Sequence, residues 1–207
     1  DGLSQRCNGS SSGFKEKIMK VAIVNASARE NGNSSHAANF IYKEILSRWP
    51  DAIVARVNLS EMNIHPCMGD AWCRRNDECM QDDDMRWIIK LLDDCDFVVF
   101  LSPVFFKDMS SLMKIFTDRC YPMIKGNPGE QKAKKSGKKA ILIMFQYVKG
   151  KGYDDALKHT EWVLENLGFD VEDSFLFRDA DDFGSAGDDE KNQQKIAKAI
   201  AAMGARK

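Results

Sequence analysis

The stretch IMKVAIVNASARENGNSSH, residues 18–36, decides the fold because it changes from a strand pattern to a polar loop and then to a helix pattern. Residues 18–25 are rich in β-branched and apolar side chains and are too few for a helix, so they predict a buried strand. From Ser34, apolar residues recur at helical spacing until Pro50, and Ser34 or Ser35 is available as the N-cap. The stretch therefore predicts a strand, a loop and a helix in succession.

The same alternation continues along the chain. Four further segments have strand character: residues 52–59, 96–102, 139–146 and 171–177. Four further segments have helix character: residues 82–95, 110–121, 153–169 and 188–204. Parallel strands need crossover connections that cover both faces of a sheet, so this order predicts an α/β fold with a doubly wound, five-stranded parallel sheet in three α/β/α layers. Ligands of such sheets bind at the carboxyl ends of the strands, which makes the loops after the first, third and fourth strands candidate sites.

Length and composition limit the function classes. We expect residues 18–207 to form one domain, and residues 1–17, which include the linker-like sequence GSSSG, to be a disordered or added leader. The formal net charge of -1 argues against nucleic-acid binding. The apolar run at residues 97–106 is too short to span a membrane. Six cysteines without a secretion signal favour a reducing, cytoplasmic setting.

The loop at residues 26–35 leads into a helix N-terminus, where unpaired N–H groups and the helix dipole favour an anion. Gly32 permits a positive φ or a close backbone approach. The loop lacks the glycine patterns of dinucleotide and triphosphate sites, so it favours a phosphate monoester. A polar turn that only caps the helix is equally compatible with the loop alone. Its hydroxyl, guanidinium and amide donors are Ser27, Arg29, Asn33, Ser34 and Ser35.

The loop after the third strand, SPVFFKDMSS at residues 102–111, is apolar where loops are normally polar. Phe105 and Phe106 suit a hydrophobic core, but beside a phosphate loop they could also form a wall for a flat aromatic ring. A phosphate at one end and a planar apolar slot at the other indicate a mononucleotide. Flavin mononucleotide (FMN) is the planar candidate.

Three separated segments resemble one family. ASARENGNSS (26–35) resembles the phosphate loop of the NADPH-dependent FMN reductase family, SPVFF (102–106) followed by LMKIFTDR (112–119) resembles its ring-binding segment, and residues 63–85 resemble the cysteine segment of its iron-sulfur flavoprotein relatives. The similarity runs from about residue 19 to residue 120. It implies a flavodoxin-like fold, which binds FMN at the switch in strand order.

The resemblance also implies roles for particular residues. It places the FMN phosphate at Ser27, Arg29, Asn33, Ser34 and Ser35, places the isoalloxazine ring against Pro103, Val104, Phe105 and Phe106, and lets Gln146 and Tyr147 close the other side. It implies an oxidoreductase that passes hydride from NADPH or NADH to FMN and on to a small-molecule electron acceptor such as a quinone, a nitro or azo compound, free flavin or a metal ion. It suggests a homodimer or homotetramer. No catalytic side chain is required, because the cofactor carries the chemistry.

Two other functions stay open at this point. An electron carrier or redox-regulatory flavoprotein would bind FMN without turning over NAD(P)H. A domain that keeps only the fold would bind no flavin, although the phosphate loop argues against it.

The cysteine segment departs from the iron-sulfur relatives. Its spacing is Cys67-x5-Cys73-x5-Cys79, with Asp70 where the second cysteine of their motif would fall. Four thiolates are the usual ligand set of such clusters, and this segment offers three. Aspartate ligation of a cluster and zinc bound with His65 or Asp70 stay open as alternatives, although the close C-x2-C pairs of structural zinc sites are absent. The sequence therefore ranks free thiols first, redox-active cysteines second and a metal third, so that no metal site is expected.

Overall fold

Five parallel strands form the centre of the computed structural model, as the strand patterns predict. The structure describes residues 18–124, 138–148, 153–180 and 184–205, and the expected leader at 1–17 lies outside these ranges. The strands are β1 (Lys20–Asn25), β2 (Ile53–Asn58), β3 (Phe97–Phe105), β4 (Asp108–Met109), β5 (Lys138–Phe145) and β6 (Phe169–Phe177). The α-helices are α1 (Asn33–Arg48), α2 (Cys73–Asn76), α3 (Met85–Asp94), α4 (Ser111–Arg119), α5 (Asp154–Asn166), α6 (Ser185–Asp188) and α7 (Glu190–Ala205). Two 3-10 turns, η1 (Leu59–Glu61) and η2 (Tyr121–Met123), complete the set of described helices.

The strand order is β2-β1-β3-β5-β6, with all neighbours parallel. Counted over the five parallel strands this is the order 2-1-3-4-5 of the flavodoxin-like fold, whose direction of winding reverses beside the first strand. Val24 pairs with Val57 on one side and Phe100 on the other, which places the ends of β1, β2 and β3 side by side. The two-residue strand β4 pairs antiparallel with the end of β3 and was not predicted.

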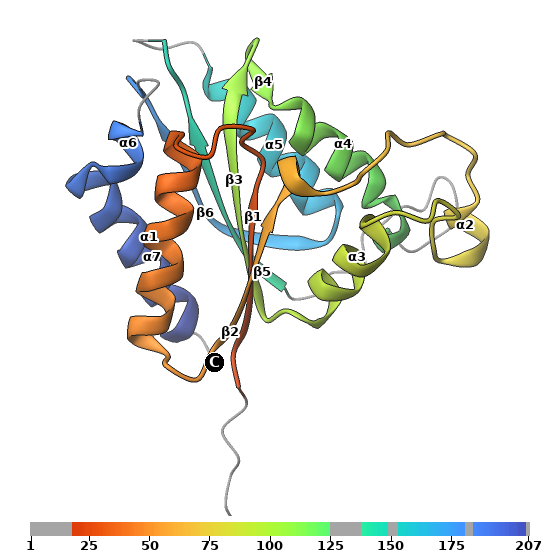
Figure 1. The fold of residues 1–207 in the computed structure, drawn as a ribbon, viewed down its shortest axis with the longest axis horizontal. Coiled ribbons are helices and arrows are strands. Elements are labelled where there is room, and N and C mark those ends of the chain that lie inside the picture. The colour runs from red at the N-terminus through yellow and green to blue at the C-terminus, as the bar shows by residue number, and fades with distance from the viewer. Residues whose placement is uncertain (1–17, 125–137, 149–152, 181–183, 206–207) are drawn as a thin grey trace, which may run out of the picture.

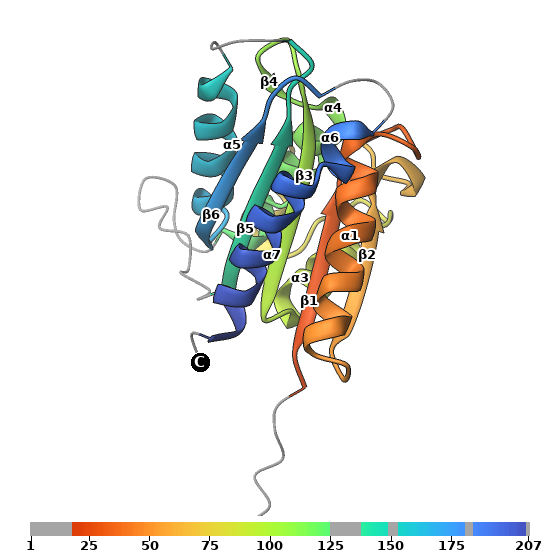
Figure 2. The same ribbon diagram turned by 90° about the vertical axis from the view of Figure 1, so that its left-hand side faces the viewer.

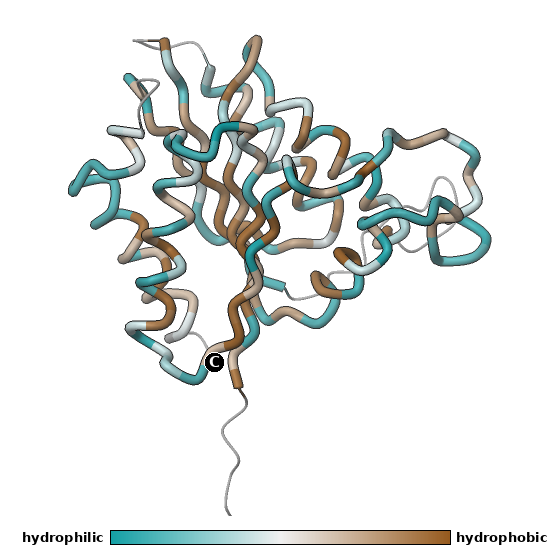
Figure 3. Tube along the Cα trace, viewed as in Figure 1, coloured by the Kyte–Doolittle hydropathy of each residue, from teal (hydrophilic) through white to brown (hydrophobic). Residues whose placement is uncertain are grey.

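Helices cover both faces of the sheet (Figures 1 and 2). α1 and α7 pack on one face, and α3, α4 and α5 lie on the other. Each face has its own hydrophobic core, because successive residues of a buried strand point to opposite sides. Ile23 and Val99 belong to the core under α1 and α7, whereas Val24 and Phe100 belong to the core under the other helices. Apolar residues accordingly concentrate in the central strands (Figure 3).

The start of α1 differs from the prediction. The helix begins at Asn33, its N-cap is Gly32, and no side chain caps it. The prediction that Ser34 or Ser35 is the N-cap is therefore wrong, since both lie within the first turn. The short helices α2 and α6 were also not predicted. Within the described ranges, no helix is both long and apolar enough to cross a bilayer.

Candidate functional site

A cavity of about 490 Å³ lies at the carboxyl ends of the strands, where the topology predicts a ligand site. We call it the edge cavity. It brings together residues from the segment between β1 and α1, the first turn of α1, the ends of β3 and β5, and the segments after β5 and β6: Ser27, Ala28, Arg29, Gly32, Asn33, Ser34, Pro103, Val104, Phe105, Phe145, Tyr147 and Ala180. Eight of the eleven residues predicted to bind FMN are in this set. The other three, Ser35, Phe106 and Gln146, lie outside it.

The polar end of the edge cavity is held by hydrogen bonds within the first loop. Asn25 Nδ2 donates to Ser35 Oγ at 3.1 Å, and Ser35 Oγ donates to the Arg29 carbonyl at 2.8 Å. The Ser27 N–H donates to Asn25 Oδ1 at 3.2 Å. Ser35 therefore holds the loop through hydrogen bonds with Asn25 and Arg29. A direct role for Ser35 in ligand binding stays a prediction.

The N-terminus of α1 opens at this end of the cavity. The N–H groups of Ser35 and His36 both reach the Gly32 carbonyl, at 3.0 Å each. No side chain caps the helix, and its first turn, where Asn33 and Ser34 line the cavity, directs the positive end of the helix dipole toward this end of the cavity, which favours an anion. Gly32 has φ of -88°, so its role is close approach, and an added Cβ would lie 3.1 Å from Arg29 Cβ.

A second helix supports the loop from the far end of the sequence. Asn33 Oδ1 accepts hydrogen bonds from the N–H groups of Ala186 at 2.8 Å and Gly187 at 3.1 Å, at the start of α6. His36 Nδ1 lies 2.6 Å from Asp188 Oδ2. Gly187 allows this contact, since an added Cβ would lie 2.3 Å from the Asn33 carbonyl oxygen. These bonds turn the amide oxygen of Asn33 toward α6, so any donation into the cavity falls to its Nδ2.

The apolar end of the cavity is the end of β3. Pro103, Val104 and Phe105 line it, and the side chain of Phe105 is 52% exposed. Phe106 and Lys107 form the two-residue turn between β3 and β4, with φ of 48° and 65°. Phe106 is fully exposed at this tip and lies outside the cavity lining, so its contact with a ring stays a prediction.

The loop after β5 provides one of its two predicted residues. Tyr147 lines the edge cavity and is 66% exposed. Gln146 is buried, and its Nε2 donates to the Val148 carbonyl at 2.5 Å. Its backbone joins the ends of β5 and β6, because the Gln146 N–H donates to Phe177 O and its carbonyl accepts from the Ala180 N–H. The structure therefore gives Gln146 a supporting place in the turn.

A buried pair of serines joins the two ends of the cavity. Ser110 Oγ caps α4 by accepting from the Met113 N–H at 3.2 Å and donates to the Ala26 carbonyl at 2.9 Å. Ser102 Oγ accepts from the Ser110 N–H at 3.1 Å. The segment after β3 is thereby tied to the segment after β1. This network was not predicted from the sequence, although a serine just before a helix pattern is a known cap signal.

The cysteine segment borders a separate cavity of about 160 Å³, which we call the loop cavity. Cys67, Cys73 and Cys79 line it, and Asp70 lies among them. Burial, followed by the neighbouring thiols of Cys79 and Cys67, raises the pKa of Cys73. The cysteine loop, residues 66–82, is mostly exposed, in contrast to the buried thiols of Cys95 and Cys120 in the core.

One buried ion pair anchors the cysteine loop. Arg119 and Asp83 are each 1% exposed at the side chain, and two hydrogen bonds of 2.6 and 2.8 Å join them. Arg119 also donates to the His65 carbonyl at 2.6 Å. Burial alone would raise the pKa of Asp83, but bonds from Arg119 and from the His65 and Met85 N–H groups lower it to about 2. The sequence did contain a sign that Arg119 is buried, because Arg119 follows Phe116 by about one helical turn and so lies on the apolar face of α4.

Comparisons with known proteins agree with this architecture. An iron-sulfur flavoprotein of Clostridioides difficile is 33% identical over 107 residues, which are 51% of this chain and 48% of that protein. An iron-sulfur flavoprotein of Archaeoglobus fulgidus is 33% identical over 104 residues, which are 50% of this chain and 46% of that protein. The chain spans about half the length of the curated relatives it matches.

Solved structures show the same fold at low identity. An FMN-dependent NADH-azoreductase from Bacillus anthracis, solved in complex with FMN, has a TM-score of 0.63 at 18% identity. The alignment covers 90% of this chain and 99% of the azoreductase chain. An NADH:FMN oxidoreductase in its apo form has a TM-score of 0.62 at 15% identity. The alignment covers 90% of this chain and 88% of the oxidoreductase chain. A family model described as NADPH-dependent FMN reductase matches residues 19–181. With most of the chain matched, this protein belongs to the NADPH-dependent FMN reductase family.

Proposed function

We propose that the protein is an FMN-dependent NAD(P)H oxidoreductase and that FMN binds in the edge cavity. The observation that carries this proposal is the composition of that cavity. An uncapped helix N-terminus with serine and arginine lies at one end, and an apolar strand end with aromatic side chains lies at the other. A phosphate monoester joined to a flat ring system has the matching order of chemical groups.

The phosphate would be held by the loop after β1. Ser27 and Ser34 offer hydroxyl groups, and the guanidinium of Arg29 can bond phosphate oxygens in pairs. The hydrogen bonds from Asn25 and Ser35 set the shape of this loop before a ligand arrives. Preorganisation of this kind reduces the entropy lost on binding.

The ring would lie along Pro103, Val104 and Phe105, with Tyr147 on the opposite side of the cavity. Bound FMN supplies the redox chemistry, accepting hydride from NADPH or NADH and passing electrons to a small acceptor. The residues of the chain would bind and orient the ring, and no acid or base of the protein is required. Phe105 and Tyr147 remain more than half exposed, which leaves room for a second flat molecule, such as a nicotinamide, a quinone or an azo compound, to stack against the ring.

Absorption spectroscopy tests the proposal directly. The purified chain is incubated with FMN, freed of excess flavin and mixed anaerobically with NADPH or NADH. Rapid bleaching of the bound flavin is expected. A flavin that binds but keeps its colour would instead indicate an electron carrier, and failure to bind FMN at all would overturn the assignment of the edge cavity.

A double substitution tests the phosphate loop. Arg29→Ala with Ser34→Ala should weaken FMN binding by about 3 kcal/mol, or more than a hundredfold, because charge-assisted hydrogen bonds are lost. Arg48→Ala, at the other end of α1, is the matched control, since its exposed pair with Glu44 is far from the cavity. Unchanged FMN affinity in the folded double variant would contradict the proposed site. The cytoplasmic location and the homodimer or homotetramer stay predictions.

A further inference from the structure

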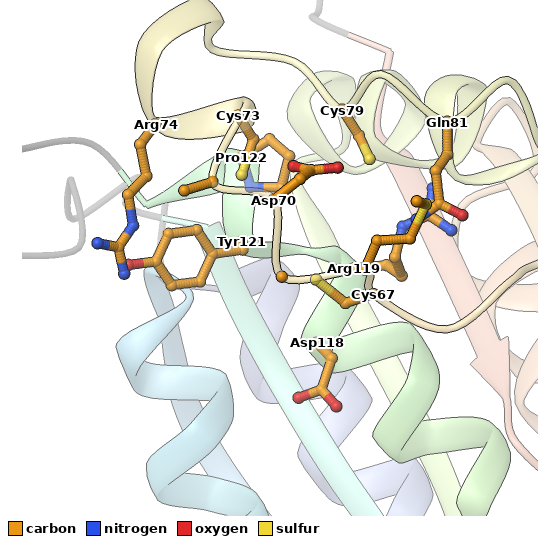
Figure 4. A pocket seen from close by; sticks show the side chains of 13 residues that line it. Cys67, Asp70, Cys73, Arg74, Cys79, Gln81, Asp118, Arg119, Tyr121 and Pro122 are labelled. Atoms are coloured by element: carbon orange, nitrogen blue, oxygen red, sulfur yellow. The ribbon is translucent and has the colours of Figure 1, made fainter.

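A second cavity lies beside the edge cavity, at the turn between β3 and β4. Its volume is about 250 Å³, and we call it the tip cavity. It shares Val104, Phe105 and Tyr147 with the edge cavity, so the two cavities adjoin. The end of β3, β4 and the start of α5 meet at this end of the sheet (Figures 1 and 2). The loop cavity (Figure 4) shares no lining residue with it. The other residues that line the tip cavity are Phe106, Lys107, Gln146, Val148 and Tyr153.

The walls of the tip cavity are largely apolar and face the solvent. Phe105, Tyr147 and Val148 are each at least half exposed, and Phe106 is fully exposed. Exposed apolar side chains gathered around one hollow are a mark of a binding site. Aromatic rings prefer to stack on other flat rings, so these walls favour a planar aromatic molecule.

Lys107 adds a positive charge to this apolar site. Its Nζ lies over the Tyr153 ring, 5.9 Å from the centroid. Within the described ranges, no carboxylate forms an ion pair with Lys107. The carboxylate of Asp154, which follows Tyr153 at the start of α5, pairs with Arg178 instead. The ammonium group of Lys107 is therefore available to an acidic group that enters the tip cavity.

The turn that carries Lys107 is strained and firmly held. Phe106 and Lys107 have φ of 48° and 65°, although neither residue is glycine. Such conformations are unfavourable for residues with a Cβ and persist where the surroundings hold them. Here the antiparallel pairing of β3 with β4 closes the turn, and His159 Nδ1 of α5 lies 3.1 Å from Asp108 Oδ1. Glycine would avoid the strain, so the turn keeps these two side chains in place at a loss of stability.

We propose that the tip cavity is the acceptor subsite of the oxidoreductase and that it takes planar aromatic acceptors with an acidic group, such as quinone sulfonates. The ring lies against Phe105 and Tyr147, and Lys107 binds the acidic group through a charge-assisted hydrogen bond. This inference rests on the proposed function, because it adds a substrate class to the same site. In the overall reaction, NADPH and one proton convert the quinone to its hydroquinone and leave NADP⁺, so electrons and protons balance. The acidic group contributes to binding alone.

A pair of probes that cannot be reduced tests the subsite without turnover. Naphthalene-2-sulfonate and naphthalene-2-sulfonamide share one ring system, but only the first is charged at neutral pH. Calorimetry on the FMN-loaded protein should show that the sulfonate binds about fivefold more tightly, as expected for one exposed ionic contact. Lys107→Met should abolish this preference, and Lys107→Arg should keep it.

Lys198→Met is the control, because Lys198 is an exposed lysine of α7, on the other face of the sheet. It should leave the preference for the sulfonate unchanged. Equal affinity of the unchanged protein for the two probes, or the same loss in Lys198→Met as in Lys107→Met, would overturn the subsite alone. Failure of the protein to load FMN would overturn the proposed function and this inference with it.

Steady-state kinetics extend the test to turnover, with anthraquinone-2-sulfonate as the acidic acceptor and menadione as the neutral one. In Lys107→Met, the ratio of kcat/KM for the sulfonate to kcat/KM for menadione should fall about fivefold, through a higher KM for the sulfonate. An unchanged ratio would contradict the proposal. A rise confined to the KM for NADPH would assign Lys107 to the nicotinamide nucleotide and would also overturn it.

Discussion

The edge cavity and the loop cavity are both lined by side chains from loops, but they are supported in different ways. The walls of the edge cavity are the ends of buried strands, joined through hydroxyl and amide groups such as Ser110, Ser35 and Asn25. The loop cavity lies under an exposed segment whose anchor is one buried ion pair, Arg119 with Asp83. The first site is part of the framework of the fold, whereas the second is held mainly by this buried ion pair, together with exposed contacts such as Gln81 with the Pro66 carbonyl and Arg74 with the Tyr121 ring.

This difference predicts which substitutions should most reduce the stability of the protein. Many weak hydrogen bonds share the support of the edge cavity, so the loss of one should be tolerated. The loss of one partner of a buried ion pair should be tolerated less well, because it leaves the other charge buried without a counter-charge.

Asp83→Ala should be the most damaging single change. It leaves the Arg119 guanidinium buried without its carboxylate, which lowers the free energy of unfolding by about 3–5 kcal/mol. Urea unfolding measures this loss of stability. Asp118→Ala is the control, because the exposed Lys114–Asp118 pair on α4 contributes about 0.5 kcal/mol or less. A loss below about 1 kcal/mol for Asp83→Ala would mean that the cysteine loop has other anchors.

Gly187→Ala should disturb the edge cavity from a distance. The new Cβ would lie 2.3 Å from the Asn33 carbonyl, so α6 must move away from α1. Overpacking of this kind destabilises by about 2–3 kcal/mol, and we expect FMN affinity to fall about tenfold as the Asn33 bonds are lost.

Gly204→Ala is the matched control for that substitution. Its Cβ would meet the Trp49 ring at 2.1 Å, at the opposite end of α1 from the edge cavity. The Gly204→Ala variant should be less stable, but its FMN affinity should be unchanged. Equal effects of the two variants on FMN binding would show that α6 has no particular role at the site.

Acid should weaken the anchor of the cysteine loop. The pKa of Asp83 is lowered to about 2 from 3.8, so its stabilising effect is complete above about pH 4 and is lost as the pH falls toward 2. The contribution is about 2 kcal/mol. Comparing urea unfolding of the unchanged protein and of Asp83→Asn between pH 6 and about pH 2.5 isolates this group from other carboxylates. A constant difference between the two over that range would contradict the prediction.

Ser110→Ala should have the smallest effect. It removes the cap of α4 and the bond to the Ala26 carbonyl, and we expect a loss of about 1–2 kcal/mol in thermal or urea unfolding. FMN affinity should change less than threefold, because the other bonds of the edge cavity remain. Ser111→Ala, at the exposed next position, should be neutral. Loss of FMN binding in Ser110→Ala would mean that the edge cavity depends on this one serine and not on several hydrogen bonds.

The sheet and its ligand edge were predictable because they follow from periodic patterns. Apolar runs such as residues 18–25 identify buried strands, and parallel topology then fixes which loops meet. Eight predicted residues, including Ser27, Arg29 and Phe105, do line one cavity. Their roles toward FMN remain predictions until a ligand is bound.

What could not be predicted depends on contacts between distant segments. Nothing near Ser35 indicates that its hydroxyl would face Arg29 rather than a ligand. The two-residue turn at Phe106 and Lys107 has positive φ without glycine, so the usual turn signal is missing. The partner of Arg119 is 36 residues away in a loop without periodicity, and only the folded chain brings them together.

The contact between Asn33 and α6 also constrains how the protein is made. Asn33 and Ala186 are 153 residues apart, yet the second supports the loop that contains the first. During synthesis the serines and the arginine of the loop after β1 leave the ribosome long before their support exists. A nascent chain that ends before Gly187 therefore carries an incomplete site. Flavin capture should be a late event, following the folding of the sheet and unable to guide it.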